Sequence, residues 1–152
     1  MGALPRSSPP PQAVELNRWT LTDGATLRQM RIELREALQA HRLAAHTSSP
    51  VAERAALVAT ELAGNALRHG RSPAVVRLLM VDGRFILDVA DQDRESVPEP
   101  AAGAHTDHGG RGLHIARSLA GELSWYTTEH AKHVWVSFPA DAASDQDAAG
   151  DI

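Results

Sequence analysis

The sequence predicts an α/β (α+β) fold, a two-layer sandwich in which helices cover one face of a mainly antiparallel sheet. Three observations lead to this fold class. The 152 residues fit a single domain. Apolar patterns follow the order β-α-α-β-β-loop-α-β-β, which is typical of helices packed on one side of a sheet. An Asp-Gly pair at 82–83 separates two apolar runs, and this is a strong hairpin signal.

The first elements follow from apolar alternation and helix capping. A loosely alternating run over 14–21 predicts an edge strand. Thr22 or Asp23 can then cap a helix over 26–43, which carries a partial apolar stripe.

The later elements alternate between helix and strand patterns. A second helix is expected from Pro50 to about His69, with Ser49 as its N-cap and Gly70 as a C-cap glycine. The rest of the chain predicts strands at 74–81 and 84–90, a long polar loop over 92–110, a short helix at about 111–120, and closing strands at about 123–127 and 133–138.

Both ends of the chain read as tails around one folded unit. Residues 1–13 are rich in Pro and Ser and predict a disordered or extended tail, without the basic start and apolar core of a signal peptide. Residues 140–152 are small and acidic and predict a second disordered tail. The domain is therefore expected over 14–139. No apolar run approaches the roughly 18 residues that span a bilayer, so we expect a soluble, cytoplasmic protein with no membrane contact.

The composition excludes several kinds of site. There is no cysteine, which rules out disulfides, Cys-based zinc sites and a Cys nucleophile. The net charge of −4 argues against direct nucleic-acid binding. The lone lysine, Lys132, stands outside a GK[ST] sequence, which excludes a P-loop, and an ordinary protein-kinase fold would lack its phosphate-binding lysine.

The second predicted helix carries the first candidate site, within LVATELAGNALRHG. Glu61, Asn65 and His69 are spaced four residues apart, so they project from nearly the same helix face. Asn65 can offer a neutral oxygen to Mg²⁺, and Glu61 can act as a general base nearby. For this stretch alone, a solvent-facing polar stripe on an amphipathic helix is the commoner explanation.

Two further segments carry candidate ligand groups. Asp88 and Asp91 interrupt the apolar strand of ILDVADQDRESVP, and a buried Asp91 can accept a hydrogen bond from an exocyclic amine such as that of adenine. Alternatively, Asp91 simply starts a turn. In HGGRGLHIARSLAG, glycines precede a predicted helix, so backbone amides and Arg111 can bind an anion there.

In this order and spacing, the three segments resemble the GHKL ATP-binding fold shared by histidine kinases, Hsp90, gyrase-type ATPases and MutL. ELAGNALRHG is similar to the N box, DVADQDRESVP stands where the G1 box falls, and GGRGLHIARSLAG is similar to the G2 box. The resemblance covers about 14–138 and is greatest to anti-sigma-factor serine/threonine kinases. It implies a Bergerat-type fold.

The resemblance also implies roles for particular residues. Glu61 would be the catalytic base, Asn65 the Mg²⁺ ligand and Asp91 the acceptor for the adenine amine, with 92–109 as the ATP lid. The implied ATP-binding residues are Asn65, His69, Asp91, Asp93, Gly110, Arg111, Gly112 and Leu113, with Asn65 as the metal ligand.

The chain departs from the family pattern in two places. Asp93 and Glu95 stand near positions where the G1 box usually has glycine, and Ala131, Lys132 and His133 replace the usual Gly and Thr of the late strand. The pairs His105/His108 and His130/His133 can be metal ligands, but neutral surface or loop histidines are the commoner explanation because no further ligands are evident.

The sequence thus favours an ATP- and Mg²⁺-dependent protein serine/threonine kinase, a transferase that phosphorylates an anti-anti-sigma (STAS-type) protein and sequesters a sigma factor. The resemblance also allows a homodimer. The alternative is a non-catalytic switch that binds a partner with or without ATP, and a generic hydrolase ranks third. No segment can hold a phosphoacceptor histidine helix pair, so a complete histidine kinase is not expected.

Overall fold

The computed structural model describes residues 5–69, 71–95 and 122–140. Its elements in chain order are β1 (Val14–Leu21), α1 (Gly24–Ala40), α2 (Pro50–His69), β2 (Ala74–Val81), β3 (Arg84–Asp91), β4 (Glu122–Thr127) and β5 (Lys132–Pro139). The five strands form one sheet in the order β1-β2-β3-β5-β4, and every neighbouring pair is antiparallel.

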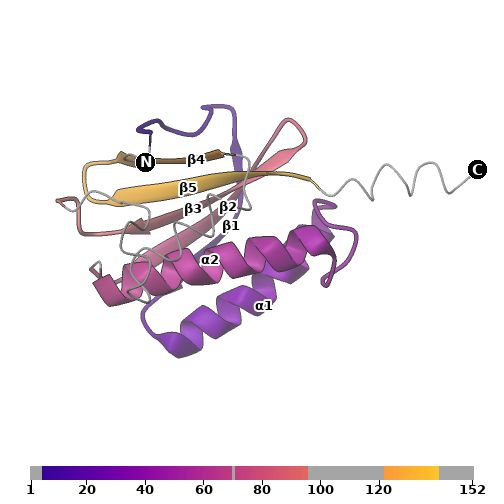
Figure 1. Cartoon of the computed structure of the whole chain (residues 1–152), viewed down its shortest axis with the longest axis horizontal. Coiled ribbons are helices and arrows are strands. Elements are labelled where there is room, and N and C mark those ends of the chain that lie inside the picture. Colours follow the sequence, from indigo (N-terminus) through magenta and orange to yellow (C-terminus); the bar gives the residue numbers. More distant parts are fainter. Residues whose placement is uncertain (1–4, 70, 96–121, 141–152) are drawn as a thin grey trace, which may run out of the picture.

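Both described helices cover the same face of this sheet (Figure 1). The alternation of β3 separates the two faces. Phe85, Leu87 and Val89 belong to the main core with the helices, whereas Ile86 belongs to a smaller apolar cluster that includes Trp135. The predicted two-layer architecture is therefore confirmed for the described part of the chain, and burial of one sheet face under the helices provides most of its core.

The β2–β3 hairpin forms where the Asp-Gly pair predicted it. Asp82 has a φ of 48° and Gly83 a φ of 75°, so both central residues are in the left-handed region that this type of tight turn requires. The register pairs Val81 with Arg84 directly across the turn. This hairpin places the far end of β3, at Asp91, next to the beginning of β2.

Helix α1 is shorter at its C-terminal end than predicted. Asp23 caps it through a capping box with Thr26, so the helix begins at Gly24. It ends at Ala40 rather than at residue 43, because Arg42 takes a φ of 61° and the Leu43 amide donates to the Leu38 carbonyl.

Helix α2 has the predicted limits, but its first turn differs in detail. The Ser49 carbonyl accepts from the Glu53 amide at 2.9 Å, whereas the buried Ser49 hydroxyl has no hydrogen-bond partner among the residues that the structure describes. The expectation that the Ser49 side chain caps this helix is therefore wrong. The backbone alone starts the helix, with Pro50 in the first turn.

Residues 5–13, part of the predicted N-terminal tail, run along the sheet. The Ser7 amide donates to the Trp125 carbonyl at 3.0 Å, and the Trp125 amide donates to the Pro5 carbonyl at 3.1 Å. The Trp135 indole donates to the Ser7 carbonyl at 2.8 Å, and the Arg6 guanidinium lies 4.8 Å from the Trp125 ring centroid. These contacts protect the edge strand β4 from pairing with another chain.

Strands β4 and β5 match the predicted closing strands, whereas the predicted helix at 111–120 and the loop at 96–110 lie outside the described residues. Among the described helices, neither has the length and apolarity that crossing a membrane requires.

Candidate ATP-binding site

The polar face of α2 forms one wall of the candidate site. Glu61 and Asn65 are half-buried and His69 is exposed, while Val58, Leu62 and Ala66, one residue further round, are buried in the core. This arrangement follows from the four-residue spacing, which places the two stripes on adjacent sides of the helix. The core contacts of the apolar stripe fix the rotation of α2 about its axis and therefore the direction of its polar face.

Asn65 has a feature that an ordinary surface amide lacks. Its Oδ1 atom is buried and has no hydrogen-bond partner among the described residues. A buried acceptor without a partner costs about 1–3 kcal/mol, so native structures rarely keep one without a reason. A neutral amide oxygen in this position fits Mg²⁺, which binds protein oxygens together with water and phosphate.

Asp91 forms a second wall, at the end of β3. Side chains alternate along β3, so Asp91, an even number of residues after Phe85, lies on the same helix-facing side of the sheet. Only 6% of its surface is exposed. The Gln92 amide donates to the Arg71 carbonyl at 3.1 Å, which holds this end of β3 against the segment that follows α2. Asp91 and the C-terminal part of α2 therefore lie at the same end of the domain.

The Asp91 carboxylate already has two neighbours. Its Oδ1 accepts from the Asp93 amide at 2.7 Å, so Asp91 does start the turn that the alternative explanation predicted. Its Oδ2 lies 3.6 Å from Lys132 Nζ, because Lys132 is the cross-strand partner of Asp91. Burial raises the pKa of Asp91, against the opposing effects of the Asp93 amide and the Lys132 ammonium.

A family model for the histidine kinase-like ATPase domain matches residues 23–138. This chain belongs to that family. Among solved structures, the ATPase domain is similar to the histidine kinase AdeS of Acinetobacter baumannii, with 14% sequence identity over 83% of this chain and 68% of that chain and a TM-score of 0.43. No curated protein matches the sequence.

Family membership implies that the domain binds ATP. The residues expected to hold the nucleotide divide into two groups. Glu61, Asn65, His69, Asp91 and Asp93 are described, and they come from α2 and from the end of β3. The predicted glycine-turn residues Gly110, Arg111, Gly112 and Leu113 lie outside the described residues, as do His105 and His108.

The two departures from the family pattern take different positions in this ATPase domain. Asp93 is half-buried, and its Oδ1 accepts from the Glu95 amide at 3.2 Å, while Glu95 itself is exposed. Lys132 Nζ lies 3.6 Å from Oδ2 of Asp91, the residue that the sequence predicts as the adenine acceptor. Of the two departures, only the lysine is in direct contact with Asp91 through its side chain.

Of the second histidine pair, His130 and His133, only one member is a surface residue. The His130 side chain is 86% exposed beside Glu129, whereas the His133 side chain is only 12% exposed and bonds to Asp88. The expectation that both are surface or loop histidines is therefore wrong for His133. Within the described residues, no group of three or more His, Cys, Asp and Glu side chains could hold a metal ion.

Sequence reasoning missed a buried polar cluster around Asp88, on the sheet face opposite the helices. Asp88 is fully buried and accepts from Tyr126 OH at 2.6 Å, Arg77 Nη2 at 3.2 Å and His133 Nδ1 at 2.8 Å. The Tyr126 ring stacks on the His133 ring at 4.4 Å. Burial, followed by the nearby Asp88 carboxylate, raises the pKa of Tyr126.

The Asp88 cluster joins β2, β3, β4 and β5, so it fixes the strands that present Asp91 and Lys132 on the other face. The only signal in the sequence was a carboxylate inside an apolar strand, which marked Asp88 without naming its partners.

Proposed function

We propose that this chain is an ATP-binding regulatory domain that transfers the γ-phosphoryl group of ATP to a serine or threonine of a partner protein. The observation that carries this proposal is the buried Asn65 Oδ1, which has no hydrogen-bond partner in the described part of the chain and lies one helical turn from Glu61 on the same face of α2. Such a pairing of a metal-ligating amide and a carboxylate suits phosphoryl transfer, in which positioning and charge neutralisation do most of the work.

Each described residue then has a task. Asn65 would hold Mg²⁺ through its amide oxygen, and the ion would supply positive charge beside the triphosphate. Glu61 would accept the proton of the acceptor hydroxyl. Asp91 would accept a hydrogen bond from the adenine amine, which favours adenine over bases lacking a donor there because its buried carboxylate would otherwise lose a partner.

The partner proteins follow from the resemblance to anti-sigma-factor kinases. The acceptor would be an anti-anti-sigma (STAS-type) protein, the sequestered protein a sigma factor, and the location the cytoplasm. The family match supports the ATP-binding part of this proposal, and the N-box residues support the kinase part.

Phosphoryl transfer from Mg-ATP to a cognate STAS-type protein tests the proposal. We expect transfer by the wild type, a loss of more than a hundredfold in Glu61→Gln with ATP binding retained, and loss of Mg²⁺-dependent ATP binding in Asn65→Ala. Transfer that is unchanged in Glu61→Gln would exclude the proposed base.

A partner-binding switch without catalysis is the second candidate. The Lys132 ammonium, 3.6 Å from Asp91 Oδ2, favours it because this cation competes with the adenine amine for the carboxylate. Calorimetric titration of ATP with and without Mg²⁺ separates the two candidates. Absence of any ATP binding would leave the switch as the only function of this domain.

A further inference from the structure

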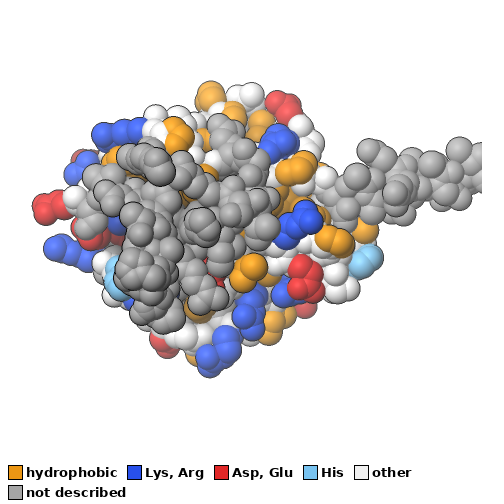
Figure 2. Space-filling view, viewed as in Figure 1, with side chains coloured by type: hydrophobic (Ala, Val, Ile, Leu, Met, Phe, Trp, Pro, Cys, Tyr) orange, Lys and Arg blue, Asp and Glu red, His pale blue; other side chains and the backbone are white. Residues whose placement is uncertain are grey.

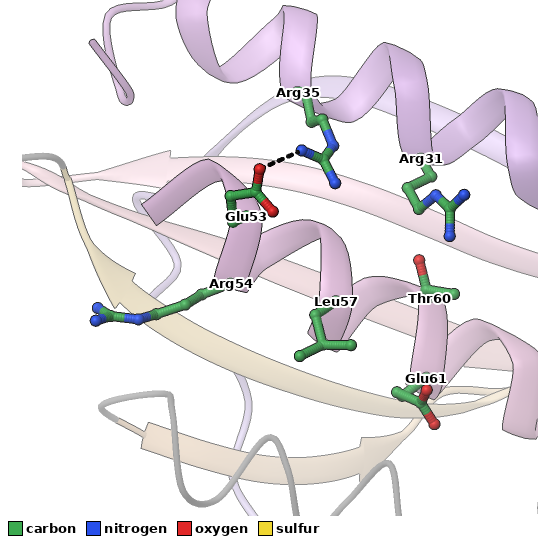
Figure 3. A pocket seen from close by; sticks show the side chains of 7 residues that line it. All are labelled: Arg31, Arg35, Glu53, Arg54, Leu57, Thr60 and Glu61. Carbon is green, nitrogen blue, oxygen red and sulfur yellow. Dashed lines mark hydrogen bonds and ion pairs between the residues drawn. The ribbon is translucent and has the colours of Figure 1, made fainter. Parts of the chain in front are cut away.

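A charged groove runs between α1 and α2, from Glu61 toward the beginning of α2. It encloses about 360 Å³. Figure 3 shows Arg31 and Arg35 on its α1 side and Arg54 and Leu57 on its α2 side, with Glu61 at one end. Figure 2 shows basic, acidic and hydrophobic side chains together on this face of the molecule. The groove therefore begins at the proposed catalytic base and extends along both helices.

The arginines of this groove are not all neutralised. Arg35 Nη1 lies 3.2 Å from Glu53 Oε2, which forms an ion pair across the two helices. Arg31 and Arg54 are exposed and have neither an ion pair nor a hydrogen bond within the described part of the chain. Two guanidinium groups in one groove, neither of them paired within the described residues, form a local site for carboxylates in a chain whose net charge is −4.

Leu57 gives the groove an apolar contact point between its charged ends. It is 43% exposed, although it lies in a helix whose neighbouring residues Val58 and Ala56 are fully buried. Thr60 does not compete for a ligand as a donor, because its hydroxyl donates to the Ala56 carbonyl at 2.7 Å. An exposed leucine flanked by guanidinium groups suits a peptide that carries both an apolar and an acidic side chain.

We propose that this arginine groove binds an acidic segment of the acceptor protein, so that its serine or threonine reaches Glu61. This inference rests on the proposed kinase function. The helical rise from Arg54 to Glu61 is about 10 Å at 1.5 Å per residue, and an extended peptide covers that length in about three residues. The acceptor hydroxyl therefore lies three or four positions from an aspartate or glutamate that contacts Arg54.

The chemical step that the groove serves is a simple transfer. The acceptor oxygen attacks the γ-phosphorus of ATP, the bond from that phosphorus to the β,γ-bridging oxygen breaks, and ADP leaves with the electron pair. The hydroxyl proton passes to the Glu61 carboxylate. The groove contributes by placing the acceptor hydroxyl, so its loss raises KM for the peptide more than it lowers kcat.

Binding is tested first, without any chemistry. The probes are a series of fluorescein-labelled 12-residue peptides, each with one Ala at the acceptor position and one Leu. Each peptide carries a single Glu, placed from one to six residues from that Ala on either side. In fluorescence anisotropy, the full chain should bind the peptides whose Glu lies three or four residues from the acceptor position at least fivefold more tightly than the Glu-free peptide. This preference should fall as salt rises.

Charge reversal identifies the groove as the binding site. Arg54→Glu and Arg31→Glu should each weaken binding about tenfold, and Arg54→Glu should restore affinity for the matching peptide with Lys in place of Glu. Arg28→Glu is the control. It makes the same charge change on α1, but its guanidinium lies back over Gly24, where Nη1 would come within 3.4 Å of an added Cβ.

The outcomes separate this inference from the proposed kinase function. Binding that is equal for all peptides, or unaffected by Arg54→Glu and Arg31→Glu, overturns the groove assignment. The groove assignment is also overturned if the peptides bind only to a chain that lacks residues 141–152. In that case the Asp-rich end of this chain would itself occupy the groove. The matching Ser peptides with Mg-ATP test catalysis. Groove-dependent binding without transfer overturns the kinase function while leaving the binding site intact.

Discussion

Asn65→Ala should raise the stability of the nucleotide-free protein and abolish the Mg²⁺ dependence of ATP binding. The buried Oδ1 of Asn65, which has no partner among residues 5–69, 71–95 and 122–140, costs the folded state about 1–3 kcal/mol. Alanine removes that cost, and its higher helix propensity adds up to about 0.7 kcal/mol in the interior of α2. Little packing is lost, since the side chain is only half-buried and its Cβ remains.

The net gain for Asn65→Ala is therefore about 1–3 kcal/mol in the absence of nucleotide. For a domain of this size, that corresponds to a rise in Tm of roughly 3–8 °C. Urea unfolding and thermal scans of the nucleotide-free protein measure it. In parallel, calorimetry should show that Mg²⁺ no longer strengthens ATP binding, because the amide ligand is gone.

Two companion variants make this result interpretable. Gln39→Ala changes an exposed position of α1 and reports helix propensity alone. Asn65→Asp keeps a metal ligand but buries a charge, so it should be less stable than the wild type without Mg²⁺ and should retain the Mg²⁺ dependence of ATP binding. If Asn65→Ala is less stable than the wild type and still binds ATP in a Mg²⁺-dependent way, the assignment of Asn65 is refuted.

Three further predictions concern the strands. Asp88→Ala should lower the free energy of unfolding by about 3–5 kcal/mol, because it removes the fully buried acceptor of partly buried donors on β4 and β5. Urea unfolding measures this change, and the exposed Glu36→Ala should alter the free energy of unfolding by less than 0.5 kcal/mol. Lys132→Thr should strengthen ATP binding about fivefold by freeing Asp91 Oδ2, and calorimetry with GTP as the control should show no such gain. The raised pKa of Asp91 means that its carboxyl binds a proton more tightly in the folded than in the unfolded state, so its contribution to stability is full at low pH and is lost as the pH rises through the folded-state pKa. The stability of Asp91→Asn relative to the wild type should therefore increase from pH 3 to pH 7 in urea unfolding, and a pH-independent difference would contradict this.

The fold was predictable because its signals are local. The Asp-Gly pair determines the β2–β3 turn, and the strand alternation then decides which side chains enter the core. The errors arose at element ends. Helix α1 stops at Ala40 because the Arg42 backbone turns left-handed, which no property of arginine predicts. At the start of α2, the buried Ser49 hydroxyl makes no cap and has no partner in the described part of the chain, which the capping preference of serine does not predict.

The partners of buried polar groups were not predictable, because they come from distant strands. Asp88 bonds to residues that are 11, 38 and 45 positions away in the sequence, on β2, β4 and β5. The pairing of β3 with β5 likewise brings Lys132 opposite Asp91. The sequence shows only that each of these residues is polar within an apolar run. Their contacts depend on the strand register, and β5 lies between β3 and β4 in the sheet although it follows β4 in the chain.

A buried acceptor without a partner does not by itself identify a site in this protein. Among the described residues, Asn17 on β1 and Ser49 before α2 also have one. Asn65 differs because it lies one turn from a carboxylate on the same helix face, within a segment that the ATPase family model covers. Native proteins keep unfavourable local features, such as a buried acceptor without a partner, mainly at functional sites. Substituting Asn65 should therefore alter ATP binding, whereas Asn17→Ala and Ser49→Ala should change stability and leave ATP affinity at its wild-type value.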